Sequence, residues 1–314
     1  MRFLTIALGL IVATVGSGYG REVLVTILSG SMHGVYYPLG TTLSSIYTQA
    51  IPGASVTVQA TDGSAENLRL LEAGHGELAF TDGDTLADAW VGNKEAGFAA
   101  PLHKLRAIAR IYPDVIQIAA SNRSGIKTLA DLKGKRISVG PRGGGTEINA
   151  AAIFKAAGFG FSDLAEVDYL PFGESVRMVI EGKLDATFQS AGLGVESIHH
   201  MMASGKARLI PIPAEVVAKV GKPVYVAATI PANTYDGQTA DVPTASIANI
   251  LVSRVGVSDD VAELMTKSLF DHLDRLVLTH PAAKDISITT AITDLPIPLH
   301  PGAERYYRDV GVLK

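Results

Sequence analysis

The chain has 314 residues, of which 47% are hydrophobic and 18% charged, so it can bury a sizeable core and is neither disordered nor fibrous. Lys and Arg number 27 against 31 Asp and Glu, a net charge of −4, which offers no basic surface for nucleic acid. Cys is absent from the sequence, which excludes disulfides, thiolate metal sites and cysteine nucleophiles.

The start of the chain has the pattern of a secretory signal peptide. Arg2 precedes an apolar stretch at 3–15, and a segment rich in Gly and Ser follows at 16–20. A helix over the apolar stretch would cover about 20 Å, short of the ~30 Å hydrocarbon core, which argues against the alternative of a membrane anchor. We therefore expect residues 1–20 to be cleaved on export and the mature chain to be periplasmic.

Short runs with β character alternate with helix-like segments in two series. In the first series, expected strands at 23–28, 55–59 and 78–80 are followed by expected helices at 38–49, 65–73 and 85–91. Two further strands, 105–111 and 115–120, are expected on either side of a turn. The second series alternates through 136–139, 147–157, 167–170, 174–181, 186–189, 195–203 and 207–210. Repeated βα units predict mostly parallel sheets with helices on both faces.

Because the pattern runs twice, we predict two α/β lobes. The chain is expected to cross between them near 115–120 and again at the apolar strand 224–230, after which 242–252 and 259–278 return to the first lobe. A cleft between lobes is where small molecules usually bind. The predicted domains are residues 21–119 and 226–314 for the first lobe and residues 120–225 for the second.

Four loops rich in Gly, Ser and Thr follow expected strands, at 29–38, 61–64, 81–84 and 140–147. In open α/β sheets, ligands bind beyond the carboxyl ends of the strands, where such loops present N–H groups and helix N-termini. Each loop alone is explained by a turn and a helix cap, but four in matching positions favour a ligand cleft. His33 in the first loop is either a ligand contact or a polar turn residue, and we expect the turn residue.

The sequence gives no sign of a cofactor, a metal site or catalysis. Loop 140–147 lacks the Lys of a phosphate-binding loop, and no dinucleotide motif follows the first strand. His199 and His200 would point about 100° apart on a helix, so they cannot hold one metal ion. No G-x-S-x-G motif occurs. We expect a binding protein rather than an enzyme, with a periplasmic enzyme and a surface protein as the alternatives.

At these residues the sequence resembles the TAXI family, the TRAP-associated extracytoplasmic immunogenic proteins that serve TRAP transporters. The matching segments include GVYYPLGTTLSSI, DGSAENLRLLEAGHGELAFTDGD, SGIKTLADLKGKRISVGPRGGGTEINA and HPGAERYY. The resemblance implies a type II-like periplasmic binding protein, with two lobes of mixed, mostly parallel sheet flanked by helices and joined by two hinge strands. It also implies a receptor that delivers a dicarboxylate or an amino acid such as glutamate to a TRAP permease. We expect a monomer.

The resemblance also implies which residues meet the ligand. Asp62 and Asp82 replace the Gly and Gln that are common in the family, and carboxylates there would repel an anionic ligand unless they are protonated or paired. An amino acid therefore competes with a dicarboxylate, its ammonium group at these carboxylates and its carboxylate at the Gly145 and Thr146 amides near Arg142. The alternative is that both Asp residues only cap helices. The candidate ligand contacts are Ser31, Gly34, Tyr36, Asp62, Gly63, Ser64, Asp82, Arg142, Gly144, Gly145, Thr146 and Gln189.

The segment HPGAERYY, residues 300–307, combines a turn with an expected closing helix. We predict that Tyr306 and Tyr307 dock the C-terminus on the first lobe.

Overall fold

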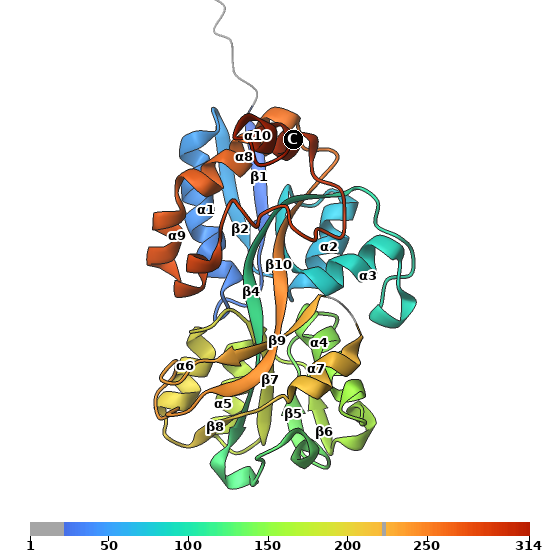
Figure 1. Ribbon diagram of the computed structural model, residues 1–314, viewed down its shortest axis with the longest axis vertical. Coiled ribbons are helices and arrows are strands. Elements are labelled where there is room, and N and C mark those ends of the chain that lie inside the picture. Colours follow the sequence, from blue (N-terminus) through green and yellow to red (C-terminus); the bar gives the residue numbers. More distant parts are fainter. Residues whose placement is uncertain (1–21, 222–223) are drawn as a thin grey trace, which may run out of the picture.

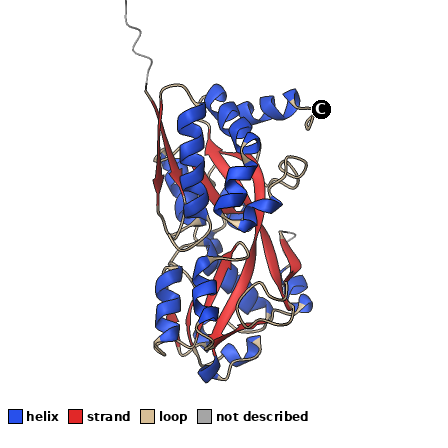
Figure 2. Cartoon of the chain, turned by 90° about the vertical axis from the view of Figure 1, so that its left-hand side faces the viewer, coloured by secondary structure: helices blue, strands red, loops and turns tan. Residues whose placement is uncertain are grey.

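Residues 22–221 and 224–314 are described by a computed structural model, which shows two α/β lobes stacked along the long axis of the molecule (Figure 1). The expected signal peptide lies outside the described residues. Within the described part, no helix is both long and apolar enough to pass through a bilayer. Helices cover both sides of the strands in the view turned by 90° (Figure 2), so the predicted fold class is confirmed.

The first lobe is built from βα units. Strand β1 pairs in parallel with β2 and β3, and the residues of β3 are all buried. Helix α1 buries Leu39, Leu43 and Ile46 at helical spacing, so one apolar stripe faces the sheet. The bounds are β1 (Val23–Leu28), α1 (Tyr36–Ala50), β2 (Ala54–Gln59), α2 (Ser64–Ala73), β3 (Leu78–Asp82) and α3 (Gly83–Val91).

The second lobe repeats this pattern around a core that contains Phe154 and Phe188. Strand β5 pairs in parallel with β6 and β7. Its helices and strands are β5 (Arg136–Ser138), α4 (Gly145–Ala156), β6 (Glu166–Asp168), α5 (Phe172–Ile180), β7 (Ala186–Ala191), α6 (Glu196–Ala203), β8 (Ala207–Ile210), α7 (Ala214–Val220) and β9 (Tyr225–Ile230). Short 3-10 helices lie at Lys94–Ala96, Asn122–Ser124, Leu129–Leu132, Phe161–Asp163 and Pro281–Asp285.

Two long antiparallel strands, β4 (Leu105–Ser121) and β10 (Val242–Arg254), run through both lobes (Figure 1). At one end β10 pairs with β3 of the first lobe, and at the other it pairs with β9 of the second. Strand β4 pairs with β7 and β8 of the second lobe. The register between the two long strands shifts next to the pair of Ala248 and Pro113. A proline in a paired strand is typically placed at such a bulge.

Two expectations about the crossings are corrected by this topology. The turn expected at Pro113 and Asp114 is absent, because β4 continues through it as one strand. The second crossing was expected at 224–230, but β9 pairs only with the first half of β10, and β10 itself makes the crossing. An isolated apolar run does not reveal which of two neighbouring strands continues into the other lobe.

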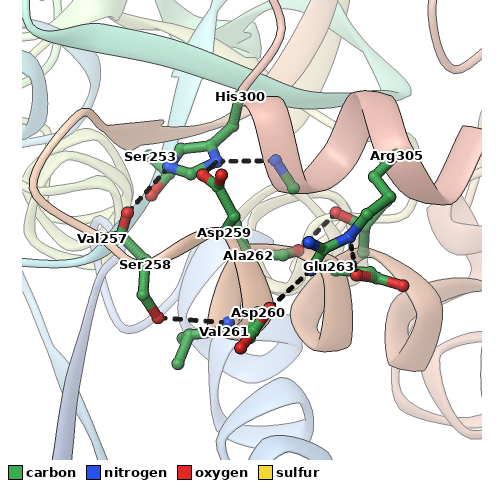
Figure 3. A network of polar contacts seen from close by, with 12 residues as sticks. Ser253, Val257, Ser258, Asp259, Asp260, Val261, Ala262, Glu263, His300 and Arg305 are labelled. Atoms are coloured by element: carbon green, nitrogen blue, oxygen red, sulfur yellow. Dashed lines mark hydrogen bonds and ion pairs between the residues drawn. The ribbon is translucent and has the colours of Figure 1, made fainter.

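The C-terminal segment packs on the first lobe through α8 (Asp259–Asp271), α9 (Leu273–Thr279) and α10 (Pro301–Asp309). His300 precedes α10, where its Nδ1 accepts from the Gly302 N–H at 3.2 Å and its Nε2 lies 3.1 Å from the Val257 carbonyl (Figure 3). Arg305 donates to Asp260 at 2.7 Å and to Glu263, which joins α10 to α8.

Tyr306 and Tyr307 are both buried, so the predicted docking of the C-terminus is confirmed. The Tyr307 hydroxyl donates to the Ile108 carbonyl of β4 at 3.0 Å. Replacing Tyr307 by Phe should lower the free energy of unfolding by about 1–2 kcal/mol, because a buried carbonyl loses its partner. Denaturant titration measures this change. Tyr306→Phe is the matched control, since that hydroxyl makes no hydrogen bond among the described residues; an equal loss in both variants would contradict the prediction.

Candidate ligand-binding site

A cavity of about 50 Å³ lies where the two lobes meet. A single water molecule needs at least about 10–15 Å³ of such space, so the cavity has room for a small polar group. The first lobe lines it with Gly30, Ser31, Gly34, Val35, Tyr36, Asp62, Gly63, Ser64 and Asp82. Strand β4 contributes Asp114, and the second lobe contributes Pro141, Gly145, Thr146, Phe172, Ser190 and Ala191.

The four loops that the sequence singled out converge on this cavity, because each follows a strand and leads into a helix. The N-termini of α1, α2 and α4 lie at its wall, through Tyr36, Ser64 and Gly145 respectively. Helix N-termini present unpaired N–H groups and a partial positive charge. The prediction that these loops share one cleft is therefore confirmed by the structure.

The lobes touch across the cavity at glycine residues. A Cβ atom built on Gly144 would lie 2.5 Å from the Asp62 carbonyl oxygen. One built on Gly145 would lie 2.2 Å from Asp82 Oδ2 and 2.7 Å from Ser64 Oγ. Both positions admit no side chain while the lobes are in contact, so the structure is that of a closed form.

Two buried carboxyl groups line the cavity. Asp82 is 2% exposed and Asp114 is 3% exposed. Burial raises the pKa of Asp82 well above its usual range, and the nearby charge of Asp114 raises it further. Burial also raises the pKa of Asp114 to about 7. The two side chains lie within hydrogen-bonding reach of each other, so at neutral pH the empty site holds at least one carboxyl proton.

Several side chains position this pair. The Tyr36 hydroxyl donates to Asp82 Oδ1 at 3.1 Å and also contacts the side-chain amide of Asn249. Asn249 follows the register shift in β10, which directs its side chain to this point. The Ser64 hydroxyl accepts from the Asp82 backbone N–H at 3.0 Å. The burial of Tyr36 and the negative charge of Asp82 beside it raise the pKa of the Tyr36 hydroxyl.

A third carboxyl, Asp84, joins the lobes beside the cavity without lining it. It is 1% exposed and accepts from the Tyr225 hydroxyl at 2.5 Å and from the Asn149 amide at 3.0 Å, both of which belong to the second lobe. Burial and the charge of Asp84 raise the pKa of Tyr225. Asp84 therefore contributes to lobe contact, whereas Asp82 and Asp114 face the cavity.

Most of the predicted contact residues line the cavity, and three do not. Gly144 packs against the Asp62 backbone at the rim. The Arg142 guanidinium lies over the Tyr169 ring, 3.7 Å from its centroid, so it is not placed to bind a carboxylate in the cavity. Gln189 is fully buried in the second lobe, where its Oε1 accepts from the Ser197 hydroxyl at 2.6 Å.

The alternative that Asp62 and Asp82 cap helices is wrong. Gly63 is the N-cap of α2, and the backbone N–H of Asp62 donates to Glu66 Oε2 at 2.6 Å. Asp82 stands at the N-cap of α3, but its side chain makes no capping hydrogen bond. His33 lies in a turn, as predicted, and its Nδ1 is 3.5 Å from Glu196 of the second lobe.

Sequence reasoning missed Asp114, Ser190 and Phe172. Among the described residues, Asp114 Oδ1 and Ser190 Oγ are buried and have no hydrogen-bond partner, and the same is true of the Asn249 amide nitrogen. Buried polar atoms are nearly always paired in proteins. The polar atoms of Asp114 and Ser190 therefore mark the part of the cavity where a ligand would supply the missing hydrogen-bond partners.

Two α/β lobes, joined by long strands and closed over one small cavity, define a two-lobed solute-binding protein. The chain belongs to the NMT1-like family, which matches residues 27–311. This is a family of periplasmic solute-binding proteins. This match does not single out the TAXI receptors, so the finer resemblance is carried only by the sequence segments quoted above.

Three solved structures share the fold. One described as a periplasmic transporter has a TM-score of 0.58 and 15% identity, with 93% of this chain and 94% of that chain covered. The alkanesulfonate-binding protein SsuA of Xanthomonas axonopodis pv. citri, bound to MOPS, has a TM-score of 0.52 and 15% identity, with 94% of this chain and 96% of that chain covered. A third structure comes from work on glutathione import by GshT and the cystine ABC importer TcyBC of Streptococcus mutans. It has a TM-score of 0.50 and 13% identity, with 82% of this chain and 93% of that chain covered.

Proposed function

We propose that the chain is a periplasmic receptor that captures one small organic acid or amino acid between its lobes and delivers it to a membrane permease. The observation that carries the proposal is the cavity between the lobes, whose wall is built by both lobes and by four loops that follow strands. A ligand that contacts both lobes stabilises the closed form, because it binds that form better than the open one.

In this proposal, β4 and β10 act as the hinge, bending near Pro113 and Ala248 where their register shifts. The predicted boundaries between the two lobes, at residues 119 and 225, stay a prediction. The path of β10 favours a return to the first lobe near residue 248 instead. The proposed ligand contacts are the sequence-predicted residues that line the cavity, together with Asp114 and Ser190.

Between the two ligand classes, the cavity favours an amino acid over a dicarboxylate. Among the described residues that line it there is no Lys, Arg or His, and three carboxyl groups are present, of which Asp82 and Asp114 are buried. One carboxylate of a ligand can be held by N–H groups at the N-termini of α2 and α4. A second carboxylate would meet Asp82 and Asp114, where burial strengthens the repulsion.

For the partner, the TAXI-like segments support a TRAP permease. An ABC importer is the second candidate, since one structure with this fold comes from work on an ABC importer. Uptake of the identified solute by cells that supply this chain with one or the other permease separates the two. Transport with a TRAP permease alone supports the first candidate.

The receptor proposal predicts that a small molecule accompanies the freshly purified protein in native mass spectrometry. That solute should raise the melting temperature of stripped protein and be recovered unchanged. At a concentration of one hundred times Kd the expected stabilisation is about 2.7 kcal/mol. Appearance of a product would favour the enzyme alternative, and failure of every solute to stabilise the protein would favour a surface protein with a vestigial cleft.

A further inference from the structure

The part of the cavity next to the hinge contains buried oxygen atoms that can accept hydrogen bonds. Asp114 Oδ1 and Ser190 Oγ are buried there and have no hydrogen-bond partner within the described chain. Asp82 Oδ2 lies on the same wall, facing Gly145 of the opposite lobe. Two of these three oxygen atoms belong to carboxyl groups and the third to a hydroxyl, so the missing partner is a group with several N–H or O–H donors.

The charge of this region selects among such groups. Asp82, Asp84 and Asp114 are each at most 3% exposed. The ionisable side chains near the Asp82–Asp114 pair are Asp84, Tyr36, Tyr112 and Tyr225, and no Lys, Arg or His of the described chain is among them. Buried carboxylates without a cation are strongly disfavoured, so the Asp82–Asp114 pair holds a proton, and a positively charged ligand group can take the place of that proton.

Resting on the receptor function proposed above, we propose that Asp82, Asp114 and Ser190 form a subsite for the primary ammonium group of the ligand. An ammonium group has three donors and one positive charge, which matches three acceptor oxygen atoms on residues that line the same small cavity. The solute is therefore an amino acid or a small amine, and a dicarboxylate without nitrogen is excluded. Asp114 and Ser190 determine this specificity.

Binding of the ammonium group should release one carboxyl proton from the site. Because burial raises the pKa of Asp114 to about 7, the empty site holds a carboxyl proton at neutral pH and below. The arriving ammonium group replaces that proton at the carboxylate, and the proton passes to solvent. Affinity should therefore rise by up to about tenfold per pH unit from pH 5 to pH 7, because each binding event releases one proton.

The test uses the complete mature protein and matched pairs of probes that differ only in the amino group: L-glutamate with glutarate, L-alanine with propionate, and glycine with acetate. Propylamine probes the amine without a carboxylate, and NaCl and KCl probe a bare cation. Isothermal titration in two buffers of different ionisation enthalpy gives Kd and the number of protons released. We expect the amino member of the preferred pair to bind at least ~30-fold tighter, with proton release.

Variants separate the subsite from the rest of the cavity. Asp114→Asn and Asp82→Asn keep the shape of the side chain, and each should weaken the amino ligand at least ~30-fold and abolish proton release. The matched control is Asp236→Asn, which removes an exposed carboxylate and should change affinity less than twofold. Melting curves of the free variants show that they are folded.

Several results would overturn the inference and leave the receptor function in place. These are equal binding of the amino and nitrogen-free members of a pair, stabilisation by Na⁺ or K⁺ as large as that by amines, and full affinity in Asp114→Asn. If no probe binds, the solute released from freshly purified protein decides: a primary amine supports the subsite, and a solute without one contradicts it. Release of no solute at all would instead refute the receptor function.

Discussion

Replacing Gly145 by Ala is expected to weaken solute binding at least ~100-fold and to leave the free protein as stable as before. The added methyl group would lie 2.2 Å from Asp82 Oδ2 and 2.7 Å from Ser64 Oγ, both of which belong to the opposite lobe. Neither neighbour can withdraw freely, since Asp82 is buried and bound by Tyr36. The variant therefore cannot close, and a hundredfold loss corresponds to about 2.7 kcal/mol.

The open form should tolerate the methyl group. Gly145 is the first residue of α4, where Ala is a better helix former than Gly by up to about 1 kcal/mol. Small-angle X-ray scattering with solute should show a compact wild type and an extended variant. Gly160→Ala is the matched control in the same lobe, because its Cβ would meet nothing within 4 Å and its φ is −140°. Normal affinity in Gly145→Ala would contradict the proposal that closure over this cavity binds the solute.

The sequence predicted those parts of the fold that follow from local pattern. Period-two apolar runs and helical stripes located the βα units, and the rule that ligands bind at the carboxyl ends of parallel strands brought Ser31, Ser64, Asp82 and Thr146 to one cavity. This rule works because it depends on chain direction alone. It needs no knowledge of which lobe a later segment joins.

The remaining errors concern long-range pairing. Pro113 and Asp114 read as a turn, yet pairing with β10 keeps β4 extended through them and places Asp114 at the cavity. Gln189 and Ser190 are neighbours on β7, so their side chains point to opposite faces, and only the pairing decided which one faces the cavity. Arg142 follows the expected loop, but its guanidinium stacks on Tyr169, a contact between residues far apart in sequence.

The pH dependence of stability in the absence of ligand should change sharply when Asp114 is replaced by Asn. Burial raises the pKa of Asp114 from 3.8 to about 7 in the folded protein, and the charge of Asp84 adds to this effect. Between these two values the folded chain holds a proton that the unfolded chain has lost. The free energy of unfolding therefore falls as pH rises from 4 to 7, and the loss is complete above the folded pKa.

The difference between the unfolded and folded pKa values of Asp114 corresponds to a loss of unfolding free energy on the order of 4 kcal/mol, at about 1.4 kcal/mol per pH unit. The Asn variant cannot titrate at this position, so its stability relative to wild type should increase from pH 5 to pH 8. Burial lowers the pKa of His280 and of His300, which titrate in the same range, but they contribute equally to both proteins and cancel in the comparison. Urea unfolding at pH 5, 6, 7 and 8 measures the difference, with Asp236→Asn as the control. Parallel pH profiles for wild type and Asp114→Asn would show that Asp114 is ionised in the empty protein, and the proton release expected on ligand binding would then be absent as well.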